Sequence, residues 1–317
     1  MSGAVDRTAI AETAEDLRPP PARGGRALER RRSRVAYGML APGGLYLLIF
    51  FLVPVGIIAY TSLKSGGLFS GGGFTFTWEF SNYTEALSEY GDIYLRSIFY
   101  AGLATIASIL LSYPMAYWIA FYGGRWKGTL FFLILVPFFV SFVIRTIQWG
   151  FILGDNGLIF EPLKNLGLLP DDFRVLATPV AVVAGITYNF LPFTALPLYV
   201  SLERIDRGLV EAAKDLYATR FDAFRKVVLP LSFPGIFAAV VLTFVPATGD
   251  YINSEVLGTT STTMIGQIIQ SKFLREFGYP EASTLSVLLM IGMLAVALVY
   301  ARVLGTEDEA LAAGAGA

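Results

Sequence analysis

Side chains that could perform catalysis are scarce in this 317-residue sequence, which contains neither Cys nor His. Thiolate nucleophiles, imidazole acid–base chemistry and metal sites built from Cys or His are therefore excluded. The sequence also lacks the G-x-x-x-x-G-K-[ST] loop that binds the phosphates of ATP, so this chain cannot hydrolyse ATP by that route. We expect no catalytic residue, no cofactor and no metal, only charged and aromatic side chains that bind.

The charged residues with the most informative spacing lie in residues 201–234, a segment too polar to cross a membrane. We expect Asp206 to be the N-cap of one short helix, and Thr219 with Asp222 to form a capping box that starts a second. Apolar side chains then share a face of each helix: Leu209, Ala212, Ala213 and Leu216, and Phe221, Phe224, Val227 and Val228. Such helices could lie on a membrane surface or dock into a groove of another protein.

The elements around this segment are those of an integral membrane protein, with 55% hydrophobic and only 15% charged residues. Soluble proteins average roughly 45–50% and about 25%. Six segments have the roughly 20 apolar residues that a bilayer crossing needs. They are residues 35–63, 97–122, 129–153, 176–200, 233–252 and 282–304. The formal charge of −1 gives no general attraction to nucleic acid, so we expect membrane lipid around the chain and no nucleic acid.

The distribution of Lys and Arg orients these six spans. With the N-terminus inside, the inner segments hold 17 of the 24 basic residues and the outer loops hold 6. Both termini are therefore expected in the cytoplasm. Residues 1–35 are a disordered tail, residues 201–232 a cytoplasmic loop and residues 305–317 a second tail. The outer polar loops are residues 64–96, 155–174 and 253–280.

One motif in the cytoplasmic loop resembles a known family. Glu211-Ala212-Ala213 precedes Val227-Val228-Leu229-Pro230 at the spacing of the EAA motif, which marks bacterial importer permeases of the ATP-binding-cassette (ABC) class. Every position matches except the glycine, which follows the EAA after three intervening residues and is Tyr217 in this chain. Because only Gly enters positive φ cheaply, we expect the turn between the two helices to shift toward Ala218-Thr219.

Three further runs are similar to permeases of spermidine/putrescine importers, and among these to the first of their two permease subunits. The third span resembles S-F-x-x-R-T-x-x-W…N-G-x-[IL], the fourth Y-N-x-L-P-F…L-P-L-Y, and the fifth F-x-P-A-x-G-D-Y with a later M-I-G-N-x-I. The corresponding residues are 141–149 with 156–159, 188–199, 244–251 and 264–269. The likeness runs from about residue 36 to residue 302.

The resemblance implies an all-α, polytopic fold of the MetI-like permease type, with about six transmembrane helices and a cytoplasmic coupling helix. It implies a permease domain over residues 36–304 that assembles with a second permease, an ABC ATP-binding subunit in two copies and an extracytoplasmic binding protein. The residues that would couple ATP hydrolysis to transport are Glu211, Ala212, Ala213, Tyr217, Leu229 and Pro230.

A polyamine cargo, also implied by the resemblance, would need carboxylates and aromatic faces along its path. Asp250 near the outer end of the fifth span is the first candidate, and Tyr251, Tyr188 and Trp149 are possible aromatic walls. A structural interpretation stays open, in which Asp250 caps the end of the span and the aromatic residues belong to the interface belt.

Arg145 lies inside the third span, where a charge is expensive and needs a partner. We expect a structural or gating ion pair, with Asp250 or Asp155 as the candidate carboxylates. The alternative is an anion-binding residue, which would argue for a carboxylate or phosphonate cargo.

Three other functions would leave different signals in the sequence. An importer of the same class with another cargo, such as an aminoethylphosphonate, an opine or another amine, stays open. A secondary transporter should show similarly interrupted spans in its two halves, and no such repeat is visible. A membrane enzyme would need catalytic carboxylates within a span, and no pair at i, i+3 or i+4 spacing is visible there.

Overall fold

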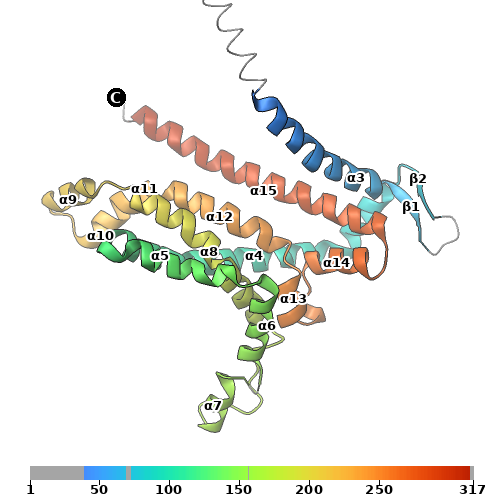
Figure 1. Cartoon of the computed structure of the whole chain (residues 1–317), viewed down its shortest axis with the longest axis horizontal. Helices are drawn as coiled ribbons and strands as arrows, with labels where there is room; N and C mark the ends of the chain where they lie inside the picture. The colour runs from blue at the N-terminus through green and yellow to red at the C-terminus, as the bar shows by residue number, and fades with distance from the viewer. Residues whose placement is uncertain (1–38, 69–72, 156, 315–317) are drawn as a thin grey trace, which may run out of the picture. The chain divides into compact units, whose positions relative to one another are not determined.

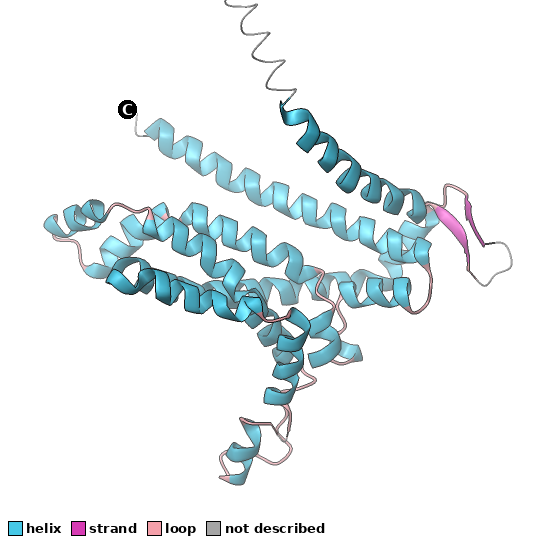
Figure 2. Cartoon of the chain, in the orientation of Figure 1, coloured by secondary structure: helices cyan, strands magenta, loops and turns pink. Residues whose placement is uncertain are grey.

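The computed structural model describes residues 39–68, 73–155 and 157–314, so the expected tail of residues 1–35 lies outside the described part. Helices dominate this part of the chain (Figure 2), which confirms the expected all-α membrane fold. The chain divides into two units, residues 1–57 and 58–317.

The described residues of the first unit form one helix that starts by Met39. A π-helical turn, Leu48–Leu52, interrupts it just before Pro54, and α3 (Val53–Ser62) continues it into the second unit. Proline has no N–H to donate to the preceding turn, and a π-turn is a common local adjustment to such a break. The expected first span therefore corresponds to the helix Met39–Ser62.

The second unit contains the remaining membrane helices (Figure 1). In the described part of the chain, four helices are long and apolar enough to cross a membrane: Met39–Ser62, Ser81–Tyr122, Pro179–Glu203 and Tyr279–Arg302. Two bent helix pairs, Gly124–Phe139 with Phe142–Leu153 and Arg220–Leu231 with Phe233–Thr248, raise the number to six if each pair is one span. These six lie where the six spans are expected.

The third expected span, residues 129–153, is broken rather than continuous. It consists of α5 (Lys127–Leu135), a 3-10 turn at Val136–Phe139 and α6 (Phe142–Leu153), and its two halves meet at 91°. Pro137 removes one helical hydrogen bond, and Val140 and Ser141 then adopt extended ψ values of 139° and 135°. The break directs α6 away from α5 (Figure 1).

The core of the second unit is formed by α4 (Ser81–Tyr122), α8 (Pro179–Glu203) and α12 (Phe233–Thr248), which all contact one another. Small buried residues on α4, among them Ala101, Ala104 and Ser108, allow α8 to approach closely. Hydroxyl groups add contacts between helices, such as the 2.8 Å hydrogen bond that joins the Thr194 and Thr243 side chains. Close packing and side-chain hydrogen bonds are the interactions that hold helices together in lipid.

The expected outer loops are more structured than the sequence indicates. Residues 64–96 begin with an antiparallel hairpin of β1 (Lys64–Gly67) and β2 (Gly73–Phe76), and α4 already starts at Ser81. The other two loops contain α7 (Phe160–Asn165), α13 (Ile252–Leu257) and α14 (Ile265–Leu274). The last helix, α15 (Tyr279–Gly314), continues beyond residue 304, where a tail was expected.

Candidate functional site

The charged loop between α8 and α12 folds as two short helices, α9 (Arg207–Asp215) and α10 (Arg220–Ala223), at one end of the long helices (Figure 1). Asp206 caps α9, because its Oδ1 accepts a 2.9 Å hydrogen bond from the Gly208 N–H. The capping box is also confirmed: the Asp222 N–H donates to Thr219 Oγ1 over 3.1 Å, and the Thr219 N–H donates to Asp222 Oδ2 over 3.3 Å. Hydrogen bonds from Thr219 hold the pKa of the Asp222 carboxyl below its ordinary value.

The turn between α9 and α10 stays at the position of the family glycine, so the expected shift toward Ala218-Thr219 is wrong. Tyr217 itself adopts a φ of +62°. The Tyr217 N–H donates to the Lys214 carbonyl over 3.0 Å and the Ala218 N–H to the Ala213 carbonyl over 3.1 Å. These two bonds make a Schellman motif, which satisfies the carbonyls at the end of α9. They favour the left-handed conformation although Tyr lacks the conformational freedom of Gly.

We predict that Tyr217→Gly stabilises the folded chain by about 1–2 kcal/mol, the cost of a left-handed L-residue. The Tyr217 side chain is 98% exposed, so little packing within this chain is lost. Thermal unfolding of the purified protein measures the change. Tyr217→Ala is the matched control, because it removes the ring but keeps the Cβ and hence the strain. Equal melting temperatures for the two variants would contradict the prediction.

The base of the loop is fixed to the membrane helices. The Arg207 guanidinium donates a 3.1 Å hydrogen bond to the Ala120 carbonyl in the last turn of α4, where a helix favours a cation. Lys127 at the start of α5 pairs with Glu203 at the end of α8 over 2.9 Å. Leu229 packs on the core cluster around buried Val228, and Pro230 starts the short helix α11 (Leu229–Leu231). These contacts join the base of the loop to the end of α4 and join α5 to the end of α8.

The tip of the loop carries exposed apolar side chains. Leu209, Leu216 and Phe221 are 49%, 82% and 68% exposed, and Glu211 and Ala212 are also exposed. The tip therefore presents a small apolar surface with one carboxylate beside it. In the isolated chain this surface is free to contact another protein.

The second group of candidate residues is buried at the junction of α6, α8 and α13. Both carboxylate oxygens of Asp250 accept from Asn253: Oδ1 from the backbone N–H over 3.0 Å and Oδ2 from the side-chain Nδ2 over 2.5 Å. The Asn253 Oδ1 in turn accepts from Asn189 Nδ2 over 3.1 Å and from the Thr146 hydroxyl over 3.3 Å. Both carboxylate oxygens of Asp250 are thus bound within this chain, and the residue is only 6% exposed.

The structure pairs Arg145 with neither expected carboxylate. Asp155 binds Arg174 over 3.0 Å and Lys164 over 3.5 Å, and the oxygens of Asp250 are held by Asn253. The Arg145 guanidinium donates from Nη1 to the Asn189 carbonyl over 3.5 Å and lies 5.6 Å from the centre of the Phe142 ring. Arg145 therefore contacts the Asn189 backbone carbonyl and the Phe142 ring instead of the expected carboxylate.

The candidate aromatic walls do not meet in one place. Trp149 and Tyr188 lie with their ring centroids 5.3 Å apart and line an apolar hollow of about 530 Å³ between α4, α6 and α8. Tyr251 lines a separate hollow of about 820 Å³ between α12, α14 and α15. Two distinct surfaces thus carry the aromatic residues that the sequence groups together.

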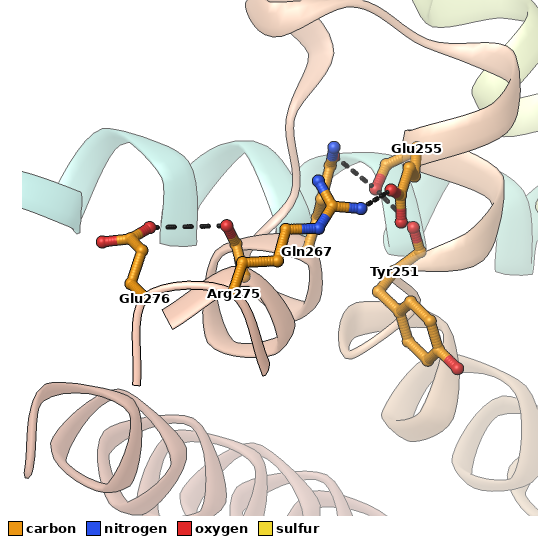
Figure 3. A network of polar contacts seen from close by, with 7 residues as sticks. Tyr251, Glu255, Gln267, Arg275 and Glu276 are labelled. Atoms are coloured by element: carbon orange, nitrogen blue, oxygen red, sulfur yellow. Dashed lines mark hydrogen bonds and ion pairs between the residues drawn. The ribbon is translucent and has the colours of Figure 1, made fainter. Parts of the chain in front are cut away.

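A network of charged and polar contacts holds α13 against α14 (Figure 3). Glu255 on α13 forms an ion pair with Arg275, and the Ser254 hydroxyl donates to Gln267 Oε1 over 3.1 Å. Next to it, Lys272 pairs with Glu276 over 2.9 Å and with Glu281 over 2.8 Å. Burial lowers the pKa of Lys272, but the hydrogen bonds that its ammonium donates to the two carboxylates outweigh burial and raise the pKa above its ordinary value. The expected outer loop of residues 253–280 is therefore cross-linked by ion pairs and hydrogen bonds.

Several residues at these sites were missed by sequence reasoning. Asn189, Asn253 and Thr146 hold Arg145 and Asp250, and Arg207 anchors the loop. The available signal is polar amide and hydroxyl groups inside apolar spans, which bind other helices in lipid.

Comparison with known proteins decides the family. Residues 86–305 match the family of binding-protein-dependent transport system inner membrane components. The chain belongs to this family. It is thus a multi-pass permease of the inner membrane, a translocation subunit.

Relatives of this permease support the assignment over most of its length. The spermidine/putrescine transport system permease protein PotB of Haemophilus influenzae is 33% identical over 260 residues, 81% of this chain and 90% of the relative. PotB of Escherichia coli K12 is 34% identical over 258 residues, 81% of this chain and 93% of the relative. The Escherichia coli inner membrane ABC transporter permease protein YdcU is 32% identical over 231 residues, 68% and 72% of the two chains.

Solved structures of low sequence identity share the permease fold. A bacterial alginate ABC transporter, solved with its alginate-bound periplasmic protein, has a chain that matches with a TM-score of 0.60 and 19% identity over 86% of this chain and 95% of that chain. A chain of the MetNI methionine ABC transporter matches with a TM-score of 0.52 and 17% identity, over 68% and 94% of the two chains. The expected MetI-like fold is therefore confirmed.

Proposed function

We propose that this permease forms, with a second permease subunit, the membrane path of an ATP-driven importer for polyamines such as spermidine and putrescine. The observation that carries the proposal is the identity of 33–34% to PotB proteins over 81% of the chain. The sequence has no ATP-binding phosphate loop, so ATP must be hydrolysed by a separate subunit. An extracytoplasmic binding protein delivers the cargo.

The loop of residues 201–232 is the proposed docking site for the ATP-binding subunits, of which we expect two copies in the importer. Its exposed apolar tip, with Glu211, Ala212 and Ala213 on α9, suits a groove on that subunit. The contacts of Arg207 and Glu203 with the ends of α4 and α5 support a lever role, because they transmit a displacement of the tip to the spans. This role requires the loop and both termini to lie in the cytoplasm, in agreement with the Lys and Arg distribution.

The cargo path is proposed to pass the aromatic pair of Trp149 and Tyr188. Its hollow is lined by aromatic and aliphatic side chains, and aromatic faces attract ammonium groups by about 0.5–2 kcal/mol. Tyr251 is a second candidate on its own hollow. Asp250 is proposed to act on this path indirectly, by holding Asn253 in place, since both of its carboxylate oxygens already accept hydrogen bonds from Asn253.

The cargo is tested with the complete importer and its binding protein in a bacterium that lacks polyamine uptake. We expect saturable uptake of labelled spermidine or putrescine that depends on the ATP-binding subunit. An aminoethylphosphonate, an opine and another amine serve as competitors. Uptake of one of these without uptake of either polyamine would overturn the proposed cargo and leave the importer class intact.

A further inference from the structure

Two opposite charges are buried inside the permease without a direct ion pair. Arg145 is 7% exposed and Asp250 is 6% exposed. Among the ion pairs of the described residues, neither takes part in one. A buried charge without compensation is strongly unfavourable, so the remaining contacts of these two side chains must offset their burial.

The contacts connect the two charges to each other. The Asp250 carboxylate accepts a hydrogen bond from the Asn253 side-chain Nδ2, and the Asn253 Oδ1 accepts one from the Asn189 Nδ2. The backbone carbonyl of Asn189 accepts from the Arg145 guanidinium. The Thr146 hydroxyl closes the chain, since it accepts from Asn189 Nδ2 over 2.9 Å and shares its proton between Asn253 Oδ1 at 3.3 Å and the Phe142 carbonyl at 3.1 Å. Asn189, Asn253 and Thr146 are fully buried. These five residues are called the polar bridge below.

The polar bridge joins the break in the third span to the end of the fifth span. Arg145 and Thr146 lie on α6, just after the 91° break of the third span. Asp250 lies between the end of α12 and the start of α13, which carries Asn253. Asn189 lies inside α8, between these two elements. The bridge therefore fixes both α6 and α13 to the core helix.

Two polar atoms of the bridge make no hydrogen bond within the described part of the chain. The Arg145 Nε and the Asn189 Oδ1 are buried and have no hydrogen-bond partner among the described residues. A buried polar group without a partner costs free energy that a different arrangement can recover. These two atoms can therefore form hydrogen bonds in a different arrangement of the bridge.

We propose that the polar bridge positions α6 and α13 for the change between outward-open and inward-open states, with Asn189, Asn253 and Thr146 as its positioning residues. The proposal rests on the importer function proposed above. Arg145 and Asp250 compensate each other through the bridge and do not contact cargo. Exchange of partners at the two unused atoms accompanies reorientation of the spans.

A pair of isosteric variants tests the positioning role in the complete importer, reconstituted in liposomes. Thr146→Val removes the two bonds by which Thr146 joins Asn189 and Asn253 to α6, whereas Thr243→Val removes the buried hydrogen bond between α12 and α8 outside the bridge. Both variants remove buried hydrogen bonds, so we expect both to lower the melting temperature. Only Thr146→Val should lower the spermidine transported per ATP, by about three- to tenfold with unchanged KM. A raised KM, or equal transport by the two variants, would overturn the proposal.

A charge cycle tests the link between the two ends of the bridge. Arg145→Gln and Asp250→Asn each leave one uncompensated buried charge, so each should reduce maximal uptake roughly tenfold or more. The maximal uptake of the double variant should be at least about threefold higher than that of the worse single variant, because no lone charge remains. If the losses of the two single variants simply added up in the double variant, in uptake and in melting temperature, the link between Arg145 and Asp250 would be overturned. Failure of the wild-type importer to move spermidine would refute the proposed cargo, whereas the melting-temperature cycle would still decide the bridge.

Discussion

Glu211→Lys should reduce uptake by the complete importer roughly tenfold or more, because juxtaposed like charges cost several kcal/mol at a protein interface. Glu211 is exposed on α9 and makes no ion pair in the described part of the chain, so its substitution leaves the permease itself folded. A basic partner on the ATP-binding subunit would then be repelled, and ATP hydrolysis would no longer drive transport. Uptake, ATP hydrolysis and melting temperature are measured on the same preparation.

Asp215→Lys is the matched control for this variant. It makes the same change in net charge one helical turn further along α9, near the helix C-terminus, where a cation is favoured. We expect uptake within about threefold of the unaltered importer, since the helix end tolerates this change. Normal uptake by Glu211→Lys, or equal losses in both variants, would contradict a specific coupling role for Glu211.

Gly185→Ala should destabilise the permease by about 1–3 kcal/mol, because the site has no room for a methyl group. Gly185 lies on α8 where α13 approaches, and an added Cβ would come within 2.7 Å of Asn253 Oδ1 and closer still to the Leu257 side chain. The clash pushes α13 away from α8 and disturbs Asn253 in the polar bridge. We expect a lower melting temperature together with a loss of uptake.

Gly102→Ala controls for the intrinsic effect of alanine in a membrane helix. Gly102 lies on α4, and an added Cβ there meets nothing within 4 Å. Alanine replaces glycine in a helix with a gain of roughly 0.5–1 kcal/mol, so this variant should be neutral or slightly more stable. A melting temperature of Gly185→Ala at or above that of Gly102→Ala would show that α13 does not press on α8.

The positions of the long apolar helices could be predicted because hydropathy alone reports them. The break in the third span could not. Pro114, Pro192 and Pro246 lie within continuous helices, whereas Pro137 precedes a 91° bend. A proline permits a break, but tertiary packing of the following helix decides whether one forms.

The ends of the helices in the cytoplasmic loop could be predicted because caps are local. Asp206, Thr219 and Asp222 form the caps that their spacing indicates. The turn at Tyr217 could not be predicted, because the penalty of a positive φ is a property of the residue type whereas the Schellman bonds belong to the helix end. The bonds keep the turn at this position and Tyr217 accepts the strain.

The polar bridge illustrates what the sequence leaves out. Arg145 and Asp250 stand out singly, as charges in apolar segments, and a direct ion pair is the simplest way to combine them. The sequence assigns no structural role to Asn189 or Asn253, yet they lie between the two charges in space. Sequence separations of 43, 64 and 107 residues between bridge partners make such an arrangement visible only in three dimensions.

Crosslinking from the tip of the loop tests the central claim, that α9 docks on an ATP-binding subunit. The chain has no cysteine, so Ala212→Cys carries a single thiol that a short thiol-to-amine reagent can join to a neighbouring protein. In the assembled importer we predict a crosslink from this position to the ATP-binding subunit, and none from Leu158→Cys, an exposed position beyond α6. An importer that transports cargo while Ala212→Cys never reaches the ATP-binding subunit would contradict the account.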